Sequence, residues 1–95
     1  MTDNDQSLKE ALEEWMKQYR HQDKFWQGKI TAAWDGIVGS VISRETENLY
    51  VSNKVLIVKL RSEALKHELE YAKRKLVKAL NKEAGAEVIT EINFV

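Results

Sequence analysis

The chain has 95 residues, of which 43% are hydrophobic and 32% charged, and its 15 basic and 15 acidic side chains give a formal net charge of zero. This length and composition are typical of one globular domain with a single modest core. The absence of cysteine excludes disulfides and thiolate metal sites, and no apolar run approaches the roughly 20 residues of a membrane span, so we expect a cytoplasmic protein without metal, cofactor or membrane contact.

A first helix is expected over residues 8–19. Ser7 and Glu10 fit a capping box at its start, in which each side chain accepts a hydrogen bond from a free backbone N–H group. We expect residues 1–6 to be flexible and residues 7–95 to form the domain. The apolar positions that recur at helical spacing are Leu8, Leu12, Trp15, Met16 and Tyr19.

A second helix is expected after a polar break at His21 and Gln22. Asp23 can cap it. Trp34 on its apolar stripe is expected in the core, as is Trp15 on the stripe of the first helix. It runs into the segment WDGIVG, where Gly36 and Gly39 enclose an apolar pair. A glycine loop that clamps a nucleic-acid backbone joins two helices, whereas here a hairpin is expected within a few residues. We therefore interpret a glycine of this segment as the stop of the helix.

A β-hairpin is expected next, from two strand-like runs at residues 47–51 and 54–61 around Ser52 and Asn53. A long helix follows, which Ser62 caps and Gly85 stops. Residues 88–95 are expected to form the last strand. The predicted order is ααββαβ, an α+β domain with a three-stranded sheet packed on helices.

Although the net charge of the chain is zero, its middle part is strongly basic. Residues 54–82 contain nine basic and three acidic side chains, whereas residues 83–95 contain no basic and three acidic ones. On the predicted long helix, basic residues recur four apart on one face with further lysines beside them. A stripe of this kind binds phosphates without reading bases. The candidate phosphate ligands are Lys54, Lys59, Arg61, Lys66, Lys73, Arg74, Lys75, Lys78 and Lys82.

Two alternatives to this interpretation stay open. The basic stripe can be a solvated helix face held by pairs with Glu70, and the chain can then be a protein adaptor that docks a partner through its acidic first helix or an apolar patch at Phe25 and Trp26. If single strands bind, aromatic side chains are needed to stack bases, and Tyr50 and Tyr71 are the candidates least tied to a core stripe. No nucleophile and base, phosphate loop or carboxylate pair points to an enzyme.

From about residue 30 onward the sequence resembles the DciA family of bacterial proteins, long known as a domain of unknown function. The resemblance is carried by WDGIVG, LIVKLRSEALKHEL, the pair Leu80 and Asn81, Gly85, and the closing VITEINFV, in that order and spacing. It implies a KH-like fold, affinity for single- or double-stranded DNA, and interaction with the DnaB-type replicative helicase, which such proteins help to load. The sequence lacks the extended tail that many relatives use with the helicase, so we expect the core domain to carry DNA binding.

Overall fold

The computed structural model describes the backbone of residues 3–95 and the side chains of residues 7–15 and 23–95. In chain order its elements are α1 (Asp3–Val38), α2 (Ser40–Glu45), β1 (Thr46–Ser52), β2 (Val55–Leu60), α3 (Glu63–Glu70), α4 (Lys73–Ala84) and β3 (Glu91–Phe94). The predicted α+β class with one three-stranded sheet is confirmed. The elements differ from the prediction in three places, because the first two predicted helices form one helix, α2 was not expected, and the predicted long helix is divided into α3 and α4.

The first helix is one element of 36 residues, so the predicted break at His21 and Gln22 is wrong. Neither residue is a strong helix breaker. The apolar stripe also keeps its phase across them, since Trp15 and Trp26 are separated by eleven residues, about three helical turns. The side chains of Met16 and Tyr19, two predicted stripe positions, lie outside the described residues, as do the side chains of the predicted flexible segment, residues 1–6.

The predicted helix caps at Ser7 and Asp23 are wrong for the same reason. The helix begins at Asp3, one turn before Ser7, so Ser7 is an internal residue. Asp23 is internal too, and its carboxylate accepts a hydrogen bond from Gln27 Nε2 at 3.1 Å instead of capping a helix.

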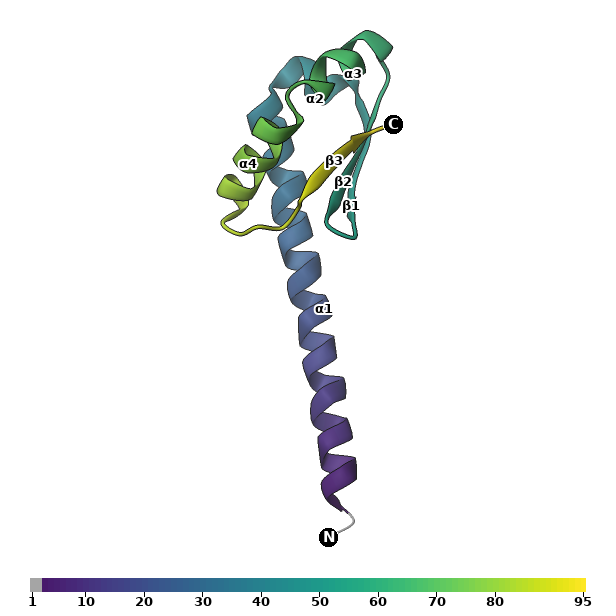
Figure 1. Cartoon of the computed structure of the whole chain (residues 1–95), viewed down its shortest axis with the longest axis vertical. Coiled ribbons are helices and arrows are strands. Elements are labelled where there is room, and N and C mark those ends of the chain that lie inside the picture. Colours follow the sequence, from purple (N-terminus) through teal and green to yellow (C-terminus); the bar gives the residue numbers. More distant parts are fainter. Residues whose placement is uncertain (1–2) are drawn as a thin grey trace.

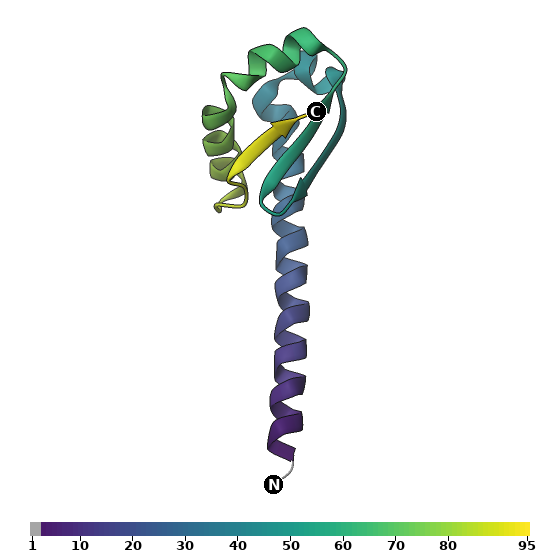
Figure 2. The ribbon, with the colours of Figure 1, turned by 45° about the vertical axis from the view of Figure 1, so that its right-hand side comes forward.

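The N-terminal half of α1 projects from the rest of the molecule. Figures 1 and 2 show it extending well beyond the sheet and the other helices, and the molecule measures 65 × 22 × 19 Å. Trp34, on the C-terminal half, is fully buried as predicted, whereas the expectation that Trp15 also belongs to the core is wrong because its side chain is 60% exposed. Only the C-terminal half of α1 therefore builds the core.

The hairpin is confirmed, with β2 as the central strand, antiparallel to β1 and parallel to β3. Asn53 and Lys54 have φ angles of 50° and 63°, as required at both central positions of the two-residue turn that matches strand twist. β2 therefore begins at Val55, and Lys54, predicted as its first residue, lies at the tip of the hairpin.

One face of the sheet packs against α1 and α4, and the core lies between them (Figure 1). Alternate residues of β2 and β3 supply its sheet side, as the period of two along a strand requires. The buried residues are Ile30, Trp34, Leu56, Val58, Leu60, Leu69, Leu80, Ala84, Ile89, Ile92 and Phe94.

The predicted long helix bends at Tyr71 and Ala72, where α3 ends and α4 begins. A straight helix from Ser62 to Gly85 would measure about 33 Å, longer than the roughly 20 Å of a six-residue strand, and would leave the compact core. The predicted caps at the two outer ends are confirmed. Ser62 Oγ accepts a hydrogen bond from Leu65 N at 3.1 Å, and Gly85 has the left-handed φ of 90°.

The last strand is shorter than predicted, Glu91–Phe94 instead of residues 88–95. The Asn81 side chain explains the difference, because it binds the backbone that precedes the strand. Its Oδ1 accepts hydrogen bonds from Val88 N at 3.0 Å and Ile89 N at 3.1 Å, and its Nδ2 donates to Ile89 O at 2.8 Å. Because these backbone groups form hydrogen bonds with Asn81, they do not pair with a strand of the sheet.

In the WDGIVG segment, the helix continues through Gly36 and stops at Gly39, whose φ is 87°. This confirms Gly39 as the stop, although α2 and not the hairpin follows it directly. The segment contains no glycine loop, since Gly36 is helical. Both glycines have open space where a Cβ would stand, so a substitution by alanine tests backbone conformation alone.

We therefore predict opposite effects of alanine at these two glycines. Gly39→Ala should lower the free energy of unfolding by about 1–2 kcal/mol, because an L-residue is strained at this φ. Gly36→Ala should raise it by about 0.5–1 kcal/mol, because it reduces the conformational freedom of the unfolded chain. Urea unfolding of both variants measures this, and equal effects would contradict the assignment of Gly39 as the stop.

Candidate nucleic-acid interface

The exposed face of α4 carries four basic side chains, Arg74, Lys75, Lys78 and Lys82. They are placed by helical spacing on the side away from Leu80 and Ala84, which are buried in the core. Within the part of the chain that the structure describes, none of the four forms an ion pair. We refer to these four residues as the α4 basic face.

The first turn of α4 is basic as well, with Lys73 beside Arg74 and Lys75, and it contains no acidic residue. Positive charge at this end of a helix opposes the helix dipole. Ala72, at the N-cap, provides no side-chain hydrogen bond to offset this. Of these three residues, Lys73 forms an ion pair with a described residue, Glu70, at 2.9 Å. The turn is therefore electrostatically unfavourable by itself and suited to an anion.

A groove runs between α4 and the segment that leads into β3. Its helix side includes Tyr71, Arg74 and Lys78, and its strand side includes Glu87 and Glu91. The two carboxylates disfavour a polyanion deep in the groove, so phosphates would lie along the helix side. Tyr71 is 83% exposed at the bend, and its ring contacts that of His67 edge to face, with 5.7 Å between the centroids.

The predicted continuous stripe from Lys66 to Lys82 does not exist as one helix face. Lys66 and Glu70 lie on α3, whereas Arg74, Lys78 and Lys82 lie on α4 beyond the bend. The bend separates Lys66 from the α4 basic face and brings Tyr71 and the first turn of α4 to the molecular surface at one corner. Sequence reasoning missed this corner, because neither glycine nor proline marks it.

The three basic residues of the hairpin differ in their surroundings. Lys59 and Arg61 form ion pairs with Glu47, at 3.7 and 3.3 Å, and Arg61 Nη1 also donates to the Arg44 carbonyl at 3.0 Å. Lys54 lies at the hairpin tip. Two of the three side chains thus form ion pairs inside the protein, and they share the single negative charge of Glu47.

Tyr50, the other predicted stacking residue, lies on β1 directly opposite Ile57 of β2. Its side chain is 48% exposed. It is therefore accessible, but it belongs to the sheet and not to the α4 corner where the uncompensated charge lies.

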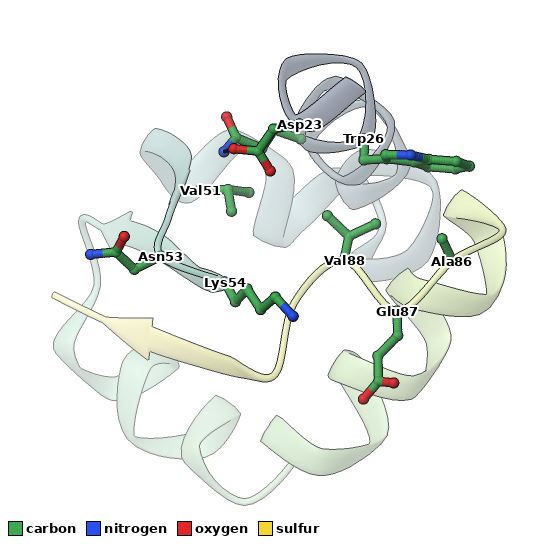
Figure 3. Close-up of a pocket in the computed structure, with 9 residues that line it drawn as sticks. Asp23, Trp26, Val51, Asn53, Lys54, Ala86, Glu87 and Val88 are labelled. Atoms are coloured by element: carbon green, nitrogen blue, oxygen red, sulfur yellow. Dashed lines mark hydrogen bonds between the residues drawn. The ribbon is translucent and has the colours of Figure 1, made fainter. Parts of the chain in front are cut away.

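A second hollow, which we call the foot pocket, lies where α1 leaves the domain (Figure 3). Its apolar wall consists of Trp26, Val51 and Val88, and Lys54 and Asp23 also line it.

Among the described residues no group of three or more acidic or imidazole side chains is placed to hold a metal ion. No helix in the described part of the chain is long and apolar enough to cross a membrane.

A comparison with protein-family models matches residues 7–94 to the family described as Dna[CI] antecedent, DciA. Neither the search of curated proteins nor the search of solved structures found a match.

Proposed function

The chain belongs to the DciA family, and from this membership and the α4 basic face we propose that it binds DNA without sequence preference while acting as an adaptor of the replicative helicase. The family implies a role in loading the DnaB-type helicase in DNA replication. The observation that carries the DNA-binding half is the set of four exposed cations on α4 without an ion-pair partner among the described residues.

The dimensions of the α4 basic face suit one DNA strand. Arg74 and Lys82 are separated by eight residues, which is about 12 Å along a helix. The phosphates of one strand rise by about 3.4 Å each along the axis of a duplex, so a face of this length parallel to the axis covers a rise of three to four phosphates. Contacts to phosphates fix the position of a strand without reading its bases. This is the property that a helicase loader requires, because it must act on any sequence.

The bend between α3 and α4 supports the same site. A KH-type clamp joins two helices and holds a nucleic-acid backbone, and Tyr71 and Lys73 flank a junction between two helices. The junction at Gly39 also joins two helices, α1 and α2, but the residues between Gly36 and Gly39 carry no charge. The exposed Tyr71 ring could stack on an unpaired base next to the bound phosphates. Lys54, Lys59, Arg61 and Lys66 would contribute at most a secondary, more distant contact.

The second candidate function is a protein adaptor without direct DNA contact. It is favoured by the exposed apolar side chains of α1, among them Phe25, which is 57% exposed and contacts Trp26 edge to face. In that case the α4 basic face is a solvated surface. The two functions differ in their dependence on salt.

We expect binding of a labelled single-stranded oligonucleotide to weaken about 50-fold between roughly 50 and 200 mM salt, as four phosphate contacts on a single strand predict. Fluorescence anisotropy measures this, with oligonucleotides of different sequence as a test of base preference. A dissociation constant that salt leaves unchanged, or no binding at low salt, would remove DNA binding and leave the adaptor. Capture of the purified replicative helicase by this chain tests the other half.

A further inference from the structure

The apolar stripe of α1 continues beyond the domain. Leu8, Leu12 and Trp15 lie on the same face of the helix as Ile30, because the separations between them are close to whole helical turns. Ile30 is fully buried, whereas the other three side chains are 62%, 54% and 60% exposed. Single exposed apolar residues are ordinary. A line of three that extends the core face of a projecting helix indicates a surface that another element covers.

The spacing of this stripe is that of a coiled-coil seam. Residues 8, 12, 15, 19, 22 and 26 alternate steps of four and three, as the two inner positions of a heptad repeat do. They are Leu8, Leu12, Trp15, Tyr19, Gln22 and Trp26. The remaining charged residues of this stretch, apart from Lys9 and Asp23, fall on the outer heptad positions. They are Glu10, Glu13, Glu14, Lys17, Arg20 and Lys24.

We infer that α1 pairs in antiparallel orientation with α1 of a second copy of this chain. A two-fold axis between residues 15 and 19 places Leu8 of one copy opposite Trp26 of the other. In this symmetric register the sequence assigns five of the six seam positions to large apolar residues and the sixth, position 22, to glutamine.

Charge complementarity selects this orientation. Lys9 and Asp23 are the two charged residues that flank the seam on the same side, and in the antiparallel register Lys9 of each copy lies beside Asp23 of the other. In a parallel pair, Lys9 and Asp23 would each lie beside a heptad position that the sequence fills with an uncharged residue. Neither charge would then meet an opposite one. Because of the two-fold symmetry, the antiparallel dimer contains the ion pair between Lys9 and Asp23 twice.

The foot pocket is the place where the paired region ends. Trp26 is both the last seam residue and part of the pocket wall, together with Val51 and Val88 (Figure 3). In the proposed register, Leu8 of the second copy lies beside Trp26, at the apolar wall of this pocket. The paired length, residues 8–26, is about 27 Å. This is less than three heptads, so the dimer is weak and forms only at high protein concentration.

The α4 basic face lies outside the proposed seam. Dimerisation through α1 is therefore independent of the proposed DNA binding. Sedimentation equilibrium of the full chain should show a monomer and dimer in exchange, with the dimer increasing from micromolar to submillimolar concentration. Leu12→Glu combined with Trp15→Glu should leave a monomer throughout. Because both side chains are exposed in the monomer, circular dichroism and the unfolding midpoint at low concentration should be unchanged.

Charge exchange tests the register. Lys9→Glu alone should raise the dimer dissociation constant about tenfold. The reason is that the new carboxylate at position 9 of each copy then lies beside the Asp23 carboxylate of the other. Asp23→Lys alone should act similarly, and the double variant should restore the original dimer constant. A mixture of Lys9→Cys and Asp23→Cys proteins should form mixed disulfide dimers in preference to either symmetric dimer.

Three results would overturn the inference. The first is a chain that remains monomeric at submillimolar concentration, which would leave the stripe to a different protein. The second is a dimer that Leu12→Glu and Trp15→Glu do not affect. The third is a double charge exchange that fails to restore what the single variants lose. DNA binding can persist in all three cases, so failure here is distinct from failure of the proposed function.

Discussion

Reversing two charges of the α4 basic face, Arg74→Glu and Lys78→Glu, should weaken binding of single-stranded DNA about 100-fold at low salt. The reason is that each lost phosphate contact removes the gain from released counterions, and each new carboxylate repels the strand. The slope of the logarithm of the binding constant against the logarithm of salt concentration should fall by about 1.4, or 0.7 for each lost contact. Fluorescence anisotropy over a range of salt concentrations measures both quantities.

Lys24→Glu with Lys29→Glu is the matched control for this experiment. These two lysines are exposed on α1, and the double variant changes the net charge by the same amount. It should weaken binding only slightly and leave the slope unchanged. If both double variants weakened DNA binding equally, the net charge and not the α4 basic face would be responsible. Unchanged unfolding midpoints for both variants exclude loss of the fold.

Trp34→Ala should lower the free energy of unfolding by about 3–5 kcal/mol, the range for removing a large buried aromatic side chain. Trp34 is fully buried, and its Nε1 donates to Thr46 Oγ1 at 3.1 Å, which links α1 to the first residue of β1. The Thr46 hydroxyl in turn donates to the Ile42 carbonyl at 2.8 Å. Since a domain of this size has a total stability of about 5–15 kcal/mol, the variant should be partly unfolded at physiological temperature.

Two further variants separate the causes of this loss of stability. The free energy of unfolding of all three variants is measured by urea unfolding at concentrations where the chain is monomeric. Trp34→Phe keeps most of the packing and loses the hydrogen bond, so it should cost about 1–2 kcal/mol. Trp15→Ala changes the same residue type on the same helix at a 60% exposed position, so it should cost less than about 0.5 kcal/mol. Similar losses for the two alanine variants would show that Trp34 does not anchor α1 to the sheet.

The two surfaces proposed for this chain lie on different elements. The α4 basic face belongs to the folded domain, whereas the seam of α1 belongs to the part that projects from it (Figure 2). A dimer through α1 would present two basic faces and thereby raise the effective concentration of one for a strand held by the other. A family member that assists the loading of a helicase onto DNA would gain from holding a strand at two points.

Local patterns predicted those features of the fold whose causes are local. The caps at Ser62 and Gly85, the hairpin, and the stop at Gly39 each depend on the conformational preference of one or two residues. The charge asymmetry along the sequence likewise indicated α4 as the candidate site, because the charge of a side chain does not depend on the fold.

The features that sequence reasoning missed depend on distance in space. Whether residues 8–38 form one helix or two could not be read from His21 and Gln22, since both are tolerated inside a helix. The bend at Tyr71 follows from the length of the sheet that α3 and α4 must cover, and the late start of β3 follows from Asn81, which holds the backbone of Val88 and Ile89.

The sequence alone thus determined the class of the fold, the hairpin turn, the caps at Ser62 and Gly85, the family and the basic stretch of the chain. Only the tertiary structure decided which charges remain without partners, which aromatic residues are exposed, and that half of α1 lies outside the core. The physical reason is that periodicity reports which side of an element is apolar. It does not report whether that side is covered by the same chain, as it is for Trp34, or is left exposed, as it is for Leu12.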